Sequence, residues 1–114
     1  MLVRKVPTGD SIEVTGVGRV RLLGVAEPFG REATDRLASL VLHRWVRLEY
    51  DPSRRAATNR QAYVLREDGV FVNAAIVRDG LARVNARHPL ARLPELLAAE
   101  RDAQRFHRGM WGVR

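Results

Sequence analysis

Arginine dominates the residues of this sequence that could do chemistry. Of the 20 basic residues in the 114-residue chain, 19 are arginine and one is Lys5, and 13 acidic residues leave a formal net charge of +7. Guanidinium groups bind phosphate bidentately and stack on bases, so an arginine-rich basic surface favours nucleic acid or another polyanion. A basic surface can also serve solubility alone. The position of the charge must therefore decide between these two interpretations.

Several other chemistries are excluded or disfavoured. The chain has no cysteine, which removes disulfides, thiol nucleophiles and zinc sites built on cysteine. His43, His88 and His107 are scattered without metal-ligand spacing, and each is expected to face solvent or to serve structure. The longest strongly apolar run, residues 37–42, is far shorter than the roughly 18 residues that cross a bilayer. No signal peptide is visible, so a cytoplasmic location is the default expectation, with secretion after trimming left open.

Apolar periodicity predicts a chain that is mainly β with helices added. Alternation of polar and apolar residues indicates strands, and apolar residues three or four apart indicate helices. The predicted strands cover residues 11–14, 19–25, 45–51, 62–66 and 70–72. The predicted helices cover residues 32–43, 73–77 and 93–110. We expect Asn73 to cap the second helix, Gly80 to end it, and Pro94 to lie in the first turn of the third.

This order of elements is of the α+β class and favours a single domain over residues 1–114. It is compatible with a five-stranded OB-fold Greek-key barrel that carries about three helices. Periodicity alone does not distinguish that barrel from a small open sheet. Trp45 and Trp111 are expected to pack in the core and at a helix end rather than to stack on bases.

A series of short motifs runs in order along nearly the whole chain. They are Gly9-Asp10-Ser11, Val20-Arg21-Leu22-Leu23-Gly24-Val25, Gly30-Arg31-Glu32-Ala33, Ala62-Tyr63-Val64, Asp68-Gly69, Val72-Asn73, Gly80-Leu81-Ala82 and Gly109-Met110-Trp111. In this order and spacing, over residues 3 to 112, the chain resembles the staphylococcal-nuclease-like, or thermonuclease, family. The resemblance implies an OB-fold barrel with three helices. It also implies calcium-dependent hydrolysis of phosphodiesters in single-stranded DNA and RNA.

The resemblance assigns roles to only some of the residues that this reaction needs. Arg21 stands where the family has its first phosphate arginine, and Asp10 stands where it has one of two metal carboxylates. The family then has Asp-x-Pro-Glu, in which the Asp binds metal and the Glu orients water. Here that run reads Ala26-Glu-Pro-Phe29, so both carboxylates are missing from their positions.

Glu27 lies between the two vacated positions. It is a candidate for the catalytic base or a metal ligand, although neighbouring strand residues point to opposite faces unless the chain bulges. The other interpretation of Glu27 is an exposed loop carboxylate.

The second phosphate arginine of the family is also uncertain in this sequence. Alignment on Ala62 and Tyr63 places Asn59 at that position, whereas alignment on Arg60 requires the deletion of one residue. Arg60 is therefore a candidate catalytic and nucleic-acid-binding residue, or else an ordinary solvated loop arginine. Two adjacent arginines in the polar run of residues 52–59 are further candidates for binding nucleic acid. They are Arg54 and Arg55.

These losses decide the functional expectation. A general base alone contributes about 10²–10⁴-fold to a rate, and calcium affinity depends on the number of charged ligands. We therefore expect a domain that binds single-stranded DNA or RNA, with weak or lost hydrolysis and weak or absent Ca²⁺ binding. One alternative is an active calcium-dependent endonuclease with a rearranged site that uses Glu27 or Glu32. The other is an inert scaffold with a protein partner.

Overall fold

A computed structural model describes residues 1–52, 60–85, 87 and 89–112. The strands are β1 (Val3–Thr8), β2 (Ser11–Val14), β3 (Gly18–Leu22), β4 (Val25–Ala26), β5 (Val46–Glu49), β6 (Gln61–Arg66) and β7 (Arg83–Val84). The helices are α1 (Gly30–Val41), α2 (Val72–Arg78) and α3 (Leu93–Arg105), followed by the short 3₁₀ helix η2 (Gly109–Gly112). Four residues named in the sequence analysis lie outside the described ranges. They are Arg54, Arg55, Asn59 and His88.

Five strands form one sheet in the order β1-β2-β3-β6-β5, and β4 pairs with β7 separately. All neighbours in the sheet are antiparallel except β3 and β6, which run parallel. The two outer strands come together where Leu2 bridges Trp45 and the amide of Val3 donates to the carbonyl of Arg44 at 3.0 Å. This contact curls the sheet into an OB-like barrel, which protects its edges. The expected fold class is confirmed.

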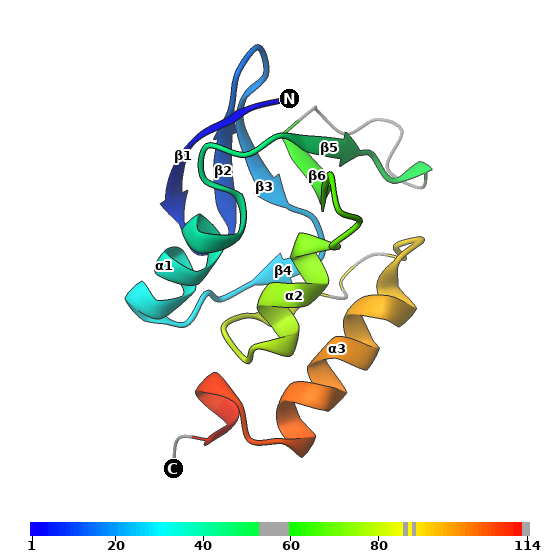
Figure 1. Ribbon diagram of the computed structural model, residues 1–114. Helices are drawn as coiled ribbons and strands as arrows, with labels where there is room; N and C mark the ends of the chain where they lie inside the picture. Colours follow the sequence, from blue (N-terminus) through cyan, green and yellow to red (C-terminus); the bar gives the residue numbers. More distant parts are fainter. Residues whose placement is uncertain (53–59, 86, 88, 113–114) are drawn as a thin grey trace.

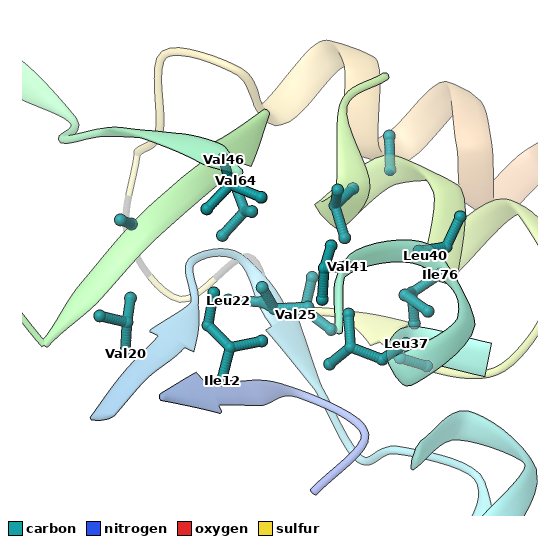
Figure 2. Close-up of a cluster of buried hydrophobic side chains, with 14 of the residues drawn as sticks. Ile12, Val20, Leu22, Val25, Leu37, Leu40, Val41, Val46, Val64 and Ile76 are labelled. Atoms are coloured by element: carbon teal, nitrogen blue, oxygen red, sulfur yellow. The ribbon is translucent and has the colours of Figure 1, made fainter. Parts of the chain in front are cut away.

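The core fills the barrel and continues between the barrel and the helices (Figure 2). Alternation along the strands sends one set of side chains inward, where they meet the apolar faces of α1 and α2. The labelled members of this core are Ile12, Val20, Leu22, Val25, Leu37, Leu40, Val41, Val46, Val64 and Ile76. Helices α2 and α3 pack against each other (Figure 1), and Leu96, Ala99 and Ala103 of α3 are fully buried. None of the described helices is long and apolar enough to span a membrane.

The β3–β6 pairing is short, and this shapes the surface. The two strands are in register only at Arg21 with Gln61 and at Leu22 with Ala62. After Leu22 the chain turns away through Gly24, whose φ of +79° few other residues adopt. The predicted strand 19–25 is therefore divided into β3 and β4. A gap opens between β3 and β6 at the point where they separate.

Several predicted boundaries are wrong for identifiable reasons. Helix α1 occupies Gly30–Val41 rather than 32–43, and the predicted strand 70–72 is a single bridge between Leu65 and Phe71. Asn73 is not a cap, because α2 begins at Val72 and the Asn73 side chain is buried and bonded to strand backbone. Strand β1 and the short strand β7 were not predicted.

Trp45 and Phe106 are exposed aromatic residues, and one of them, Trp45, was expected in the core. Trp45 is 59% exposed because Val46, the next residue on the seam, points into the core and alternation turns Trp45 outward. The predicted helix 93–110 ends at Arg105, and Phe106 is 56% exposed. His107 follows with a φ of +52°, which breaks the helical path.

Gly80 and Pro94 have the predicted roles. Gly80 follows α2 with a φ of +76°, and a Cβ there would lie 2.1 Å from the carbonyl oxygen of Arg108. Pro94 lies in the first turn of α3. His43 and His107 are exposed, as expected.

Candidate nucleic-acid interface

A cleft of about 290 Å³ opens where β3 and β6 separate. Its residues come from β3, the turn after it, the start of β6 and the segment before α3. They are Arg21, Leu22, Leu23, Gly24, Val25, Gln61, Asn85, Arg87 and Leu90. The polar members of this described set are two arginines and two amides, and none is a carboxylate. Such a lining suits an anionic ligand with hydrogen-bond acceptors.

Arg21 is presented to the cleft by strand alternation. Val20 and Leu22 are buried on either side of it, so the side chain of Arg21 points outward and is 59% exposed. Its backbone amide donates to the carbonyl of Arg60 at 2.6 Å, which ties β3 to the start of β6. Its Nη2 lies 3.3 Å from Oδ2 of Asp10. A guanidinium has five N–H donors, so this single long contact leaves donors for a ligand.

Asp10 is held in the turn between β1 and β2 and is only 7% exposed. Its Oδ1 accepts a hydrogen bond from Thr8 Oγ1 at 2.8 Å, and its carbonyl accepts from the amide of Leu22. The turn fits tightly on α1, because a Cβ on Gly9 would lie 2.5 Å from Cβ of Ala33. The structure thus brings Asp10 and Arg21 together, as the resemblance implied, with both carboxylate oxygens already engaged.

Glu27 is directed toward another part of the surface. It follows β4 with a φ of +52°, is well exposed, and its Oε2 lies 3.4 Å from Nε of Arg83. The guanidinium of Arg83 lies 4.7 Å from the ring centroid of Trp111. Glu27 therefore pairs with β7, and its exposure agrees with the interpretation of an exposed loop carboxylate.

The vacated carboxylate positions are filled by residues without oxygen ligands. Ala26 has no functional group, and Phe29 packs against the core, with its amide donating to the carbonyl of Leu81 at 2.7 Å. Within the described ranges no group of three or more His, Cys, Asp or Glu side chains could hold a metal ion. Calcium takes six to eight oxygen ligands, with carboxylates prominent among them. One carboxylate, Asp10, does not fit that requirement.

Arg60 adjoins Arg21 through a backbone hydrogen bond and directly precedes the cleft residue Gln61. It is exposed at the start of β6, and the bond from Arg21 to its carbonyl fixes its backbone beside β3. The structure thus places Arg60 at the same edge as Arg21, whereas Arg54 and Arg55 lie outside the described residues.

Sequence reasoning missed Gln61, Asn85 and Arg87. Gln61 enters the cleft because it is the register partner of Arg21. Asn85 is bonded to the opposite wall, with its amide donating to the carbonyl of Gly24 at 2.8 Å and its Oδ1 accepting from the amide of Arg87 at 3.2 Å. No local pattern marks these three residues, because only the packing of distant segments makes them neighbours.

A buried polar network anchors the cleft wall that carries Arg87 and Leu90. Tyr63 donates its hydroxyl to Asp51, which also accepts from the amide of Ala91 at 2.7 Å. Arg92 forms a bidentate pair with Glu49 at 2.6 and 2.9 Å. Burial raises the pKa of Tyr63, and the hydrogen bond from Arg92 lowers the pKa of Glu49. These contacts fix the start of α3 against β5 and β6.

Asn73 of α2 supports the cleft from the interior of the protein. Its Oδ1 accepts from the amide of Val64 at 2.9 Å, and its Nδ2 donates to the carbonyls of Leu23 and Ala62 at 2.9 and 3.2 Å. One fully buried amide therefore joins α2 to β6 and to the turn that follows β3, at the point where the two strands separate.

The barrel and its cleft define a class: a small OB-like protein whose surface hollow suits an anion. Residues 8–113 match the sequence model of the family described as staphylococcal nuclease homologue, and the chain belongs to this family. It is similar to the thermonuclease of Staphylococcus intermedius, at 31% identity over 126 residues, covering 96% of this chain and 74% of the relative. It is also similar to the thermonuclease of Staphylococcus hyicus, at 30% identity over 125 residues, covering 96% and 73%. The chain is a nuclease-like domain.

Proposed function

We propose that this protein binds single-stranded DNA or RNA in the cleft beside Arg21 and has little or no phosphodiester hydrolysis. The observation that carries the proposal is the composition of the cleft. Arg21 and Arg87 line it with two amides, and no carboxylate is among its described residues. Two guanidinium groups suit phosphates, and amides suit sugars and base edges.

The loss of hydrolysis follows from the residues that remain near Asp10. The expected base position carries Phe29, and the second metal position carries Ala26. Asp10 itself is bonded to Thr8 and Arg21. A strand held in this cleft would meet guanidinium groups that bind its phosphates but no placed carboxylate to activate water. Binding should therefore be independent of Ca²⁺.

The test measures binding and cleavage in the same samples. A fluorescent single-stranded DNA and a matching RNA are incubated with the protein in Ca²⁺ and in excess chelator, and anisotropy and product size are followed. We expect equal affinity in both conditions and no cleavage. Arg21→Ala should weaken binding by about tenfold, as expected for loss of one charge-assisted phosphate contact, and should lower the slope of log K against log salt by about 0.7.

The matched control is Arg44→Ala. Arg44 is exposed on the barrel seam, outside the cleft, and its removal changes net charge by the same amount. If both variants weaken binding equally, the cleft is not the site. If the wild-type protein binds neither DNA nor RNA at low salt, the proposal fails. A scaffold role with a protein partner then becomes the better explanation, because exposed tryptophans such as Trp45 are enriched at protein interfaces.

A second candidate, an active nuclease with a rearranged site, depends on Glu32. This residue is exposed in the first turn of α1 and has no hydrogen-bond or ion-pair partner among the described residues. Ala33, the next residue, touches the Asp10 turn at Gly9. Calcium-dependent cleavage that is lost in both Glu32→Gln and Arg21→Ala would establish this second function.

A further inference from the structure

An exposed aromatic ring flanked by two arginines lies at the far end of α3. Phe106 immediately follows the helix and is 56% exposed. The guanidinium groups of Arg105 and Arg108 lie 5.5 and 5.0 Å from the centroid of its ring. At these distances both cations are attracted to the ring face. We call Arg105, Phe106 and Arg108 the Arg–Phe–Arg array.

Backbone contacts hold the array in place. The amide of Arg108 donates to the carbonyl of Ala103 at 2.9 Å, and its Nη1 donates to the carbonyl of Arg78 at 3.3 Å. The next residues pack on the end of α2, where the amide of Met110 donates to the carbonyl of Gly80 at 2.9 Å. The ring and its arginines therefore project from a packed junction of α2 and α3, which limits the entropy lost when a ligand binds.

The surface around the array is positively charged. Arg101 precedes Arg105 by one helical turn, both are exposed, and within the described residues neither has a carboxylate partner. Asp102, between them in sequence, has its Oδ2 3.6 Å from Nε of Arg78 on α2. A shallow hollow follows this face of the helix, lined by Ala98, Arg101, Asp102, Gln104 and Arg105. Unneutralised guanidinium groups beside an exposed ring are the combination that binds single-stranded nucleic acid, with phosphates on the cations and a base on the aromatic group.

Helix α3 connects the array to the cleft. The amide of Leu93 donates to the carbonyl of Leu90, which lines the cleft, so the helix begins at the cleft wall. From there its 13 residues extend over about 20 Å. Figure 1 shows α3 running from the segment beside the barrel to the end of the molecule where η2 turns back. A short strand in the cleft cannot reach the array, but a longer strand can.

From these observations we infer that the Arg–Phe–Arg array is a second contact site for the same single strand, one that only oligonucleotides longer than the cleft engage. This inference rests on the proposed function, because the cleft supplies the first contact. The array adds a contact between one base and the exposed part of the Phe106 ring, and phosphate contacts to Arg105 and Arg108.

The test compares oligonucleotides of two lengths at the limits of what an OB fold covers, about 4 and about 15 nucleotides. Wild-type protein should bind the longer strand more tightly. Phe106→Leu keeps an apolar side chain but removes the ring. It should weaken binding of the longer strand about fivefold or more and leave binding of the shorter strand unchanged. The double variant Arg105→Ala/Arg108→Ala should lower the salt slope for the longer strand by about 1.4 and leave that for the shorter strand unchanged.

The matched control is the double variant Arg4→Ala/Arg44→Ala. Both residues are exposed near the barrel seam, and the change in net charge is the same. Circular dichroism and thermal unfolding establish that each variant is folded. Equal loss in the control would assign the effect to net charge and overturn the inference.

The remaining outcomes separate the inference from the proposed function. If Phe106→Leu and the array double variant bind both lengths like wild type, the array is not a contact site, while binding in the cleft stands. If they weaken binding of both oligonucleotides equally, the effect is not confined to longer strands, and the inference is again overturned. If wild-type protein binds neither length, the proposed function fails and the inference fails with it.

Discussion

Among single substitutions of the residues that support the cleft, Asn73→Ala should be the most destabilising. The side chain is fully buried, and its amide makes one bond to an N–H group and two to carbonyl groups. Alanine suits a helix interior better than asparagine does, so local propensity opposes the expected effect by about 0.5 kcal/mol. The direction of the change therefore tests the tertiary contacts and not the helix.

The magnitude follows from the groups that lose a partner. The amide of Val64 and the carbonyl of Leu23 each lose their bond to Asn73, whereas the carbonyl of Ala62 still accepts from the amide of Leu23 at 2.9 Å. A buried group left unsatisfied costs about 1–3 kcal/mol. We expect the free energy of unfolding to fall by about 3 kcal/mol, which for 114 residues corresponds to a drop in Tm of about 12 °C.

Urea unfolding followed by tryptophan fluorescence measures this difference if the m-value is unchanged. Asn85→Ala is the matched control, because it is the same substitution at an exposed residue whose Oδ1 makes one bond at 3.2 Å. We expect a change below about 0.5 kcal/mol there. A loss for Asn73→Ala below about 1 kcal/mol would refute the reasoning that this amide joins α2 to β6 and to the turn after β3.

Three further predictions concern stability. Gly80→Ala should lower the free energy of unfolding by about 2 kcal/mol or more, because φ is +76° and a Cβ would lie 2.1 Å from the carbonyl oxygen of Arg108; denaturant unfolding measures the loss. Burial raises the pKa of Tyr63 above its ordinary value of 10.0, so the contribution of Tyr63 to stability should be constant below about pH 10 and fall as pH rises beyond it; Tyr63→Phe should remove this dependence in an alkaline unfolding series. The hydrogen bond from Arg92 lowers the pKa of Glu49 below 4.5, so its stabilisation should be present above about pH 4.5 and disappear as pH falls below it; Glu49→Gln should show a flatter acid unfolding curve.

Most strands and helices were predictable because their signals are local, whereas the barrel was implied by the family resemblance. Alternation along residues 11–14, the strand-forming residue types of 62–66 and the apolar spacing in α1 and α3 are all local signals. The ordered motifs then indicated the family, which the matching family model and both thermonuclease relatives confirm. Composition added the expectation of a polyanionic partner, which stays a prediction.

Other features were not predictable, because their signals are not local. Asparagine is a common helix cap, yet the side chain of Asn73 bonds to backbone groups of β6 and of the turn after β3 rather than to its own helix. Trp45 has the residue type of a core, but its place on the barrel seam turned it outward. In both cases a tertiary contact overrode a residue preference.

Some features of the candidate site also follow from the sequence, whereas others follow only from the tertiary structure. The sequence by itself determined the family and the lack of a carboxylate at residues 26 and 29, and it made Asp10 and Arg21 candidate site residues, because these depend on residue identity and order. Only the tertiary structure decided that Glu27 pairs with Arg83 and that Arg87 lies in the cleft with Arg21. The physical reason is that a side chain's partners are chosen by packing between segments distant in sequence, and no local spacing records which segments meet.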